Sequence, residues 1–151
     1  MIPPSICIIS CGKAKYWDAH PDDATNTVKP ARDVYTGPLF KKCAELAELT
    51  HPYNWYILSD KYGLITPDQL IQNYDVSPEV IKDNNLFRLL VEFQALSLNI
   101  LKTERVVAPV GKIHESVIKS VFTDSGYINP LAGMSQGKRM QTLTRLIKDK
   151  P

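Results

Sequence analysis

Short apolar runs separated by longer stretches of helical spacing set the pattern of this chain. Residues 6–9 form a continuous run of isoleucine and cysteine, and residues 54–59 and 105–109 contain two more runs. Runs of this length and composition are typical of strands that are buried on both faces of a sheet. A weaker run at residues 127–129 predicts a short fourth strand.

The stretches between these runs predict amphipathic helices. One helix begins at Pro38, a residue suited to the first helical position, and runs to about residue 49. A second helical region spans residues 77–101, with Asn84 and Asn85 as a candidate interruption. A third follows Lys112, and Ser135 can cap a fourth near the end of the chain. Residues 16–33 show neither period and indicate a long loop, which is usually functional or mobile in a compact domain.

Alternation of strands and helices predicts an α/β fold with three layers, in which helices cover both faces of a mainly parallel four-stranded sheet. The length of 151 residues favours a single domain over residues 1–151. Right-handed crossovers bring the carboxyl ends of the strands to one edge, where open α/β sheets bind their ligands. The residues expected to converge there are Ser10, Cys11, Gly12, Lys13, Lys15, Ser59, Asp60, Gly111, Lys112 and Asn129.

Composition is that of a soluble globular protein, with 44% hydrophobic and 23% charged residues. The net charge of +2 neither requires nor excludes nucleic acid, so any basic surface for it has to be local. Three cysteines without a C-x-x-C pair favour a reduced, cytoplasmic protein over a disulfide scaffold. We expect no signal peptide and no membrane partner, because no apolar run approaches membrane-spanning length.

The polar residues that follow the first strand offer three possible chemistries. Lys15 is a candidate nucleophile, because a lysine desolvated beside another cation such as Lys13 or Lys112 becomes a competent amine. Alternatively, Lys13 and Lys15 form a phosphate-binding pair. A third possibility places Cys11 as nucleophile with a histidine, His20 or His114, as its base; against it, Cys11 is a small residue at the end of a buried strand.

Carboxylates that follow the second apolar run are candidate general bases. Asp60 and Asp75 could activate water or stabilise a developing sugar cation, although aspartate also supplies turn and capping contacts at such positions. The sequence has no Walker or G-x-G-x-x-G motif, and its three histidines lack zinc spacing. We therefore expect neither a cofactor nor a metal.

Three blocks of the chain together resemble one known family. They are Cys-Gly-Lys-Ala-Lys at residues 11–15, Val-Tyr-Thr-Gly-Pro-Leu-Phe at residues 34–40, and Trp-Tyr-Ile-Leu-Ser-Asp-Lys-Tyr-Gly-Leu-Ile at residues 55–65. They look like the signature blocks of small uncharacterised bacterial, archaeal and phage domains similar to the YaaA group. Residues 129–140 look like the terminal block of that family.

Two further resemblances bear on function. The first block is similar to the Pro-Cys-Ser-x-x-Lys-Pro-Tyr motif of archaeosine synthase, whose lysine attaches to a nitrile-bearing deazaguanine; Cys11 and Lys15 match, whereas Ser10 and Gly12 depart from it. The strand and helix order also resembles the uracil-DNA glycosylase superfamily. That superfamily usually has an acidic or amide residue just after its first strand, so such an activity here would depend on Asp60 or Asp75.

These patterns and resemblances lead to one main hypothesis and two alternatives. The main hypothesis is a nucleobase-directed enzyme on DNA, or less favoured RNA, that hydrolyses the base–sugar bond, with the base stacked between Tyr35 and Tyr62 beside Gly63. The alternatives are a deazaguanine-modifying enzyme acting through Lys15, and a nucleotide- or nucleic-acid-binding module without chemistry. In each case Lys138 and Arg139, cations in the first turn of the last helix, are expected to contact a phosphate.

Overall fold

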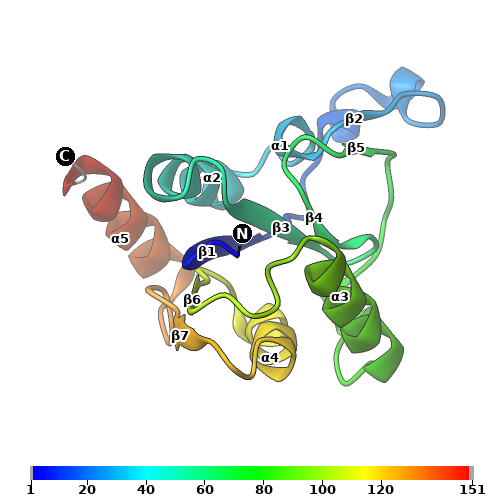
Figure 1. Cartoon of the computed structure of the whole chain (residues 1–151). Helices are drawn as coiled ribbons and strands as arrows, with labels where there is room; N and C mark the ends of the chain where they lie inside the picture. Colours follow the sequence, from blue (N-terminus) through cyan, green and yellow to red (C-terminus); the bar gives the residue numbers. More distant parts are fainter. Residues whose placement is uncertain (1, 150–151) are drawn as a thin grey trace.

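A five-stranded sheet forms the centre of the molecule in the computed structural model, which describes residues 2–149 (Figure 1). Its strands are β1 (Ser5–Ser10), β3 (Trp55–Ser59), β4 (Gly63–Ile65), β6 (Arg105–Val107) and β7 (Gly126–Ile128). They are ordered β4-β3-β1-β6-β7. The alternating sequence of strands and helices therefore produces the α/β fold that the apolar pattern predicts.

Four of these strands are parallel, as expected, and the fifth is an addition that the sequence pattern did not predict. β1 pairs in parallel with β3 and with β6, and β6 pairs in parallel with β7. β4 pairs antiparallel with β3, with Ile57 opposite Ile65. The prediction of a four-stranded sheet was wrong, because it lacked β4. The polar residues and glycine at residues 60–63 form a tight turn, and this turn returns the chain to the same sheet.

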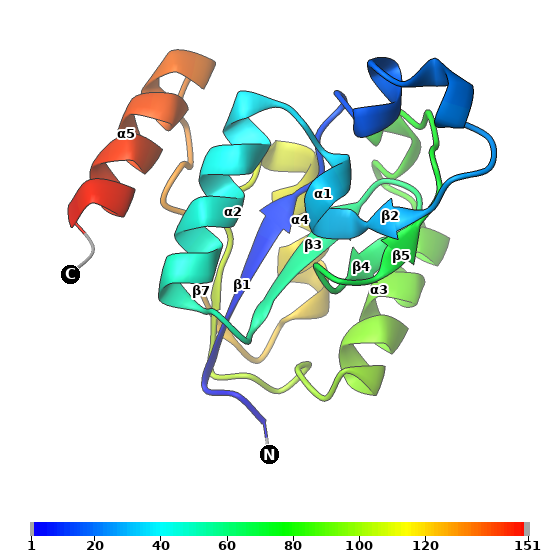
Figure 2. The same ribbon diagram turned by 90° about the horizontal axis from the view of Figure 1, so that it is seen from above.

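Two helices cover each face of the sheet (Figures 1 and 2). On one face lie α2 (Pro38–Thr50) and α5 (Gln136–Asp149), which pack against each other. On the other lie α3 (Asn85–Ser97) and α4 (Lys112–Val121). Successive side chains of β1 alternate between the two resulting cores, with Ile6 and Ile8 in one and Cys7 and Ile9 in the other.

The second helical region is divided at Asn84 and Asn85, where the sequence indicated an interruption. A single 3₁₀ turn, η3 (Pro78–Val80), precedes α3, and the side chain of Asn84 caps α3 by accepting a hydrogen bond of 3.1 Å from the amide of Phe87. Asparagine caps a helix well because its side-chain oxygen satisfies an amide that has no partner in the first turn. The cap therefore fixes where α3 begins.

Residues 16–33, expected to be a loop, contain short regular elements. Two 3₁₀ turns, η1 (Tyr16–Asp18) and η2 (Pro21–Asp23), lead into β2 (Lys29–Pro30) and α1 (Ala31–Val34). β2 pairs antiparallel with β5 (Leu70–Ile71) in a small second sheet. Among residues 2–149, no helix is both long enough and apolar enough to span a membrane.

Candidate functional site

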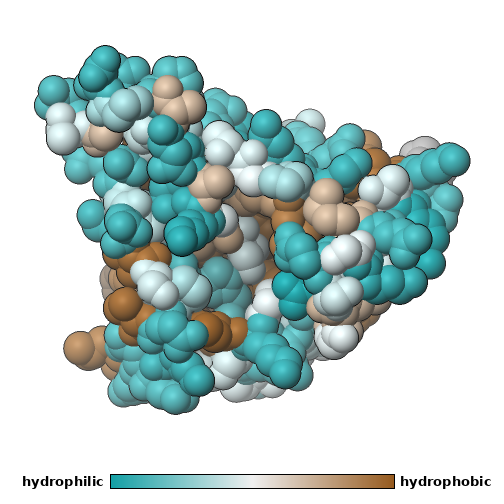
Figure 3. Space-filling view, turned by 180° about the vertical axis from the view of Figure 1, so that it is seen from behind, coloured by the Kyte–Doolittle hydropathy of each residue, from teal (hydrophilic) through white to brown (hydrophobic). Residues whose placement is uncertain are grey.

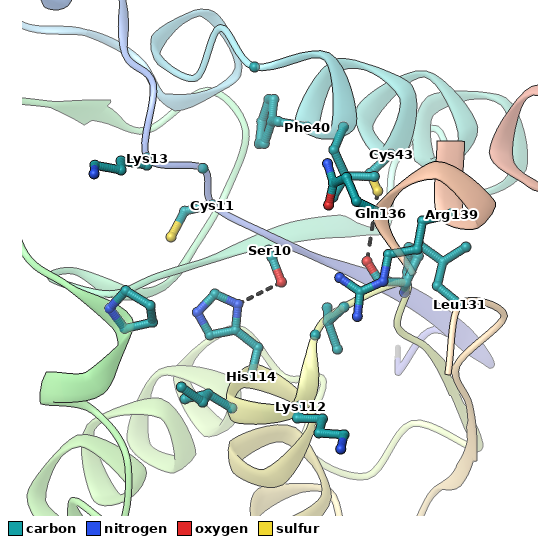
Figure 4. A pocket seen from close by; sticks show the side chains of 18 of the residues that line it. Ser10, Cys11, Lys13, Phe40, Cys43, Lys112, His114, Leu131, Gln136 and Arg139 are labelled. Carbon is teal, nitrogen blue, oxygen red and sulfur yellow. Dashed lines mark hydrogen bonds between the residues drawn. The ribbon is translucent and has the colours of Figure 1, made fainter. Parts of the chain in front are cut away.

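A cavity of about 560 Å³ opens at the carboxyl ends of β1 and β6, where the crossover rule places a ligand site. Its walls come from the segment after β1 and from the first turns of α2, α4 and α5. Figure 4 shows Ser10 and Cys11 from the end of β1, His114 from α4 and Arg139 from α5 around this space. Segments far apart in the sequence therefore build one site.

A chain of three polar side chains lies at this cavity. His114 hydrogen-bonds through Nδ1 to the Ser10 hydroxyl at 2.6 Å and through Nε2 to Oδ1 of Asp60, also at 2.6 Å. His114 and Asp60 are both buried. Ser10 and His114 line the cavity, whereas Asp60 is not among the lining residues. The hydrogen bond to His114 links Asp60 to the lining.

The chemistry of these groups fixes the direction of each hydrogen bond while His114 is neutral. A carboxylate only accepts, so Nε2 of His114 donates its proton to Asp60. Nδ1 then has a free lone pair and accepts the Ser10 hydroxyl proton. This is the serine–histidine–aspartate arrangement of acid–base catalysis, with the two ring nitrogens exchanged relative to the usual case.

Cys11 lies in the same step but is held as a thiol. Burial, and after it the negative charge of Asp60, raise the pKa of Cys11 to about 12. His114 bonds to Ser10 and Asp60, and His20 stacks on Tyr16 with ring centroids 4.0 Å apart. The hydrogen bonds of both histidines therefore go to groups other than Cys11, and the structure favours Ser10 over Cys11 as the partner of His114.

Lys15 lies on the other side of the β1 carboxyl end and is 6% exposed. Its ammonium donates to the carbonyl of Lys13 at 3.0 Å and lies 4.5 Å from the ring centroid of Tyr74. The Tyr74 hydroxyl in turn bonds to Tyr35 at 2.6 Å and accepts from Ser59 at 3.0 Å. Lys15 is therefore fixed above a network of three hydroxyl groups, and it does not line the cavity.

The aromatic residues expected to hold a base do not flank a common space. Tyr35 is 2% exposed and packs on Phe40, so neither of its faces is available to a stacked base. The ring of Tyr62 is edge-on to Tyr74, and its hydroxyl bonds to the backbone of Gln72. Both tyrosines belong to the framework around Lys15.

The remaining residues expected after the second strand lie apart from the cavity. Ser59 caps the following turn, because its hydroxyl accepts hydrogen bonds from the amides of Lys61 and Tyr62. Gly63 adopts a φ of +78°, which glycine tolerates, at the start of β4. Asp75 is exposed and is not among the lining residues.

Of the candidate site residues in the second half of the chain, some line the cavity and others lie outside it. Gly111, Lys112 and Arg139 line the cavity together with Gly12 and Lys13. Outside it, Asn129 donates to the carbonyl of Val110 at 2.9 Å and to Glu115 at 2.7 Å, so it holds the turn before α4, and Lys138 is an exposed residue of α5.

Three side chains at the site are of the types that bind transition metals. The potential ligand atoms of Cys11, Asp60 and His114 all lie within 4.8 Å of one another. However, the 2.6 Å between His114 and Asp60 is a direct hydrogen bond. Two ligands of one tetrahedral zinc, each about 2 Å from the ion, lie farther apart than that. The arrangement as it stands is that of an acid–base pair.

Comparison with known proteins places the chain in a family. A model described as a family of unknown function, DUF6884, matches residues 6–145. The chain belongs to this family. It is also 34% identical over 153 residues to the uncharacterized protein YfjM of Bacillus subtilis (strain 168), with 96% of each chain covered. The matched range includes all the residues that line the cavity.

Proposed function

We propose that this protein is a hydrolase that cleaves the bond between a nucleobase and its sugar, with DNA favoured over RNA as the source of the base. The observation that carries the proposal is the hydrogen-bonded chain from Asp60 through His114 to Ser10 at a cavity with cationic walls. The strand and helix order of the sequence, which resembles that of the uracil-DNA glycosylase superfamily, supports the nucleobase as the target. A volume of about 560 Å³ suits one nucleoside unit.

Each member of the chain has a distinct role in this reaction. A water held by Ser10 attacks the anomeric carbon, and the C–N bond breaks with its electron pair passing to the base. Ser10 takes a proton from the water as it gives its own to Nδ1 of His114. Asp60 orients the imidazole and stabilises the imidazolium across the 2.6 Å contact. Lys13, at the cavity, stabilises negative charge on the departing base.

The proposal is tested on oligonucleotides that carry uracil, hypoxanthine or a hypermodified pyrimidine. Removal of the base leaves a site that breaks in alkali, so wild type should give strand scission on at least one substrate. Ser10→Ala and His114→Gln should abolish it, while His20→Asn should not, because His20 is exposed and contacts Tyr16 instead. The same oligonucleotides as RNA test the choice of DNA. Intact strands with every substrate would rule out base excision.

A second candidate function is archaeosine-type chemistry, in which Lys15 forms an adduct with a nitrile-bearing deazaguanine. The observation that favours it is a buried ammonium whose contacts are a carbonyl and an aromatic face, with no carboxylate within 4.0 Å in the described structure. Intact-protein mass spectrometry after mixing with the deazaguanine nucleoside should show an adduct on wild type that Lys15→Ala lacks. Identical spectra for the two proteins would exclude it.

A further inference from the structure

The cavity is lined by cations without a balancing acid. Lys13, Lys112 and Arg139 contribute to its lining, and no aspartate or glutamate among residues 2–149 does so. Asp60 is not among the lining residues, and it accepts a hydrogen bond from His114. A concave site with charges of one sign concentrates a ligand of the opposite sign. The lining therefore favours an anion.

Arg139 is the cation placed to bind that anion at close range. Its Nε is buried and has no hydrogen-bond partner among the described residues. A Cβ at Gly111 would lie 3.8 Å from its Nη1, so the guanidinium rests on the residue that precedes α4. No side chain caps the first turn of α4. Figure 4 shows Arg139 reaching from α5 to the side of the cavity where Ser10 lies, while Lys112 extends away from His114.

These features match the requirements of a phosphate group. A guanidinium binds phosphate oxygens through two parallel hydrogen bonds, and uncapped amides at a helix N-terminus bind the same oxygens. A buried Nε without a partner also needs an acceptor, because an unsatisfied buried donor costs free energy. Phosphate would supply what the guanidinium and the first turn of α4 both lack.

We infer that this end of the cavity binds the phosphate of a nucleotide, with Arg139 as its main ligand, and that the sugar lies against Ser10 and His114. The nucleoside part of this inference rests on the proposed function. The phosphate is either the monoester of a free nucleotide or the diester of a strand, and both present the same oxygens to Arg139.

Equilibrium binding without turnover tests this inference separately from catalysis. Calorimetry with deoxyuridine, deoxyuridine 5′-monophosphate, inorganic phosphate and a short uracil-containing oligonucleotide measures the contribution of each part. Arg139→Gln should weaken binding of the monophosphate by about 10- to 100-fold and leave the nucleoside unchanged, as expected for a hydrogen bond to a charged group. Arg139→Lys should recover part of the loss. Lys138→Gln, its exposed neighbour on α5, should have a smaller effect.

The outcomes separate this inference from the proposed function. If the monophosphate binds through Arg139 but no base is released, the phosphate site stands and the glycosidic hydrolysis fails. Tight binding of the oligonucleotide alone, lost in Arg139→Gln, identifies a strand as the source of the phosphate. Equal affinity for the nucleoside and its monophosphate, or an Arg139→Gln variant that binds as wild type, would overturn the inference, as would no binding of any probe.

An independent feature lies on the opposite side of the molecule, where α3 exposes an apolar face. Its inner face is buried by Phe87, Val91 and Ala95. Its outer face carries five large hydrophobic residues that are between 39% and 79% exposed: Leu86, Leu89, Leu90, Phe93 and Leu96. Figure 3 shows hydrophobic side chains gathered at the lower left, over α3. Contiguous apolar surface of this kind marks a site of association.

The spacing of this face points to a second copy of the chain. Leu86, Leu89, Phe93 and Leu96 recur at intervals of three and four residues, which is the seam of a two-helix coiled coil. This seam is symmetric about Val91, the middle of α3. In an antiparallel pair of α3 helices about a two-fold axis, Leu86 of each helix therefore lies level with the other copy's Leu96, and Leu89 with Phe93.

We propose that α3 forms a two-fold symmetric, antiparallel contact between two copies of this protein. One helix pair provides less area than the ~800 Å² per partner of a standard interface, so a dissociation constant in the micromolar range is expected. Analytical ultracentrifugation over a concentration series should show a reversible monomer–dimer equilibrium. Phe93→Glu should abolish the dimer, whereas Tyr53→Glu, a change at an isolated aromatic that is 92% exposed, should not.

A wild-type protein that stays monomeric throughout the series contradicts the proposal, as does a dimer that Phe93→Glu leaves intact.

Discussion

The thiol of Cys11 distinguishes a serine-based site from a cysteine-based one. Burial and the charge of Asp60 raise its pKa from an ordinary value of 9.0 to about 12. A difference of about three pH units reduces the thiolate fraction at neutral pH by about 1000-fold. Cys7 and Cys43 are also buried, and their pKa values are likewise raised to about 12. The folded protein should therefore have no fast-reacting thiol.

Titration with a chromogenic disulfide reagent, in the presence of a metal chelator, measures this directly. Near pH 8 the folded protein should react about 1000-fold more slowly than free cysteine, and all three thiols should react at once after denaturation. The rate for Cys11 should rise about tenfold per pH unit without a plateau below about pH 11, because only the thiolate attacks the reagent. Cys11→Ser should retain whatever activity wild type shows.

The opposite result would change the assignment of the nucleophile. Rapid stoichiometric labelling of the folded protein that disappears in Cys11→Ser would mean that Cys11 is a thiolate at neutral pH. His114 would then act as the base for Cys11 and not for Ser10. The hydrogen bond of 2.6 Å between Ser10 and His114 would therefore not be the one used in catalysis. Loss of activity in Cys11→Ser with Ser10→Ala unaffected would give the same answer.

Three further variants test other parts of the structure. Asp60→Asn should abolish turnover while sparing ligand binding, because the carboxylate orients the imidazole of His114. In a protein that only binds its ligand, the same variant would leave the affinity unchanged or raise it. Calorimetry together with the scission assay distinguishes an enzyme from a binding module. Hydrogen bonds from an amide and a phenol hold the pKa of Glu115 below its usual range, so wild type should lose stability relative to Glu115→Gln as the pH falls below about 4.5, measured by urea unfolding. Asn84→Ala removes the cap of α3 and should lower the free energy of unfolding by about 1 kcal/mol in the same assay, whereas Asn84→Asp should not.

Much of the fold follows from apolar patterning because the strongest patterns are unambiguous. The run at residues 6–9 is buried on both faces of β1, and Pro38 begins α2 as its fixed φ favours. The sequence pattern did not predict β4, because three residues after a polar turn are too few to show the periodicity that distinguishes a strand from a loop. In α3 the apolar residues occupy an exposed face as well as the buried one, so their spacing could not show which of them pack in the core.

The sequence predicted at which edge of the sheet the site lies, but not which hydrogen bonds join its side chains. Crossover handedness brings Ser10 and Lys112 to one end of the sheet, and both line the cavity. The hydrogen bonds of His114 join residues 104 and 54 positions away, and they depend on which side of α4's first turn faces β1. A histidine on a helix next to a predicted strand end was the available signal, and it was considered only as a base for Cys11.

The position of Asp60 alters the chemistry that its carboxylate can perform. From the sequence it was a candidate to act directly on water or on a sugar cation. In the structure its Oδ1 accepts a hydrogen bond from His114, and Asp60 is not among the residues that line the cavity. The same carboxylate also helps to keep Cys11 protonated. One buried carboxylate thus fixes which ring nitrogen of His114 faces Ser10 as an acceptor, and it disfavours a thiolate at Cys11. In the proposed reaction, Ser10 is then the group that passes protons at the cavity.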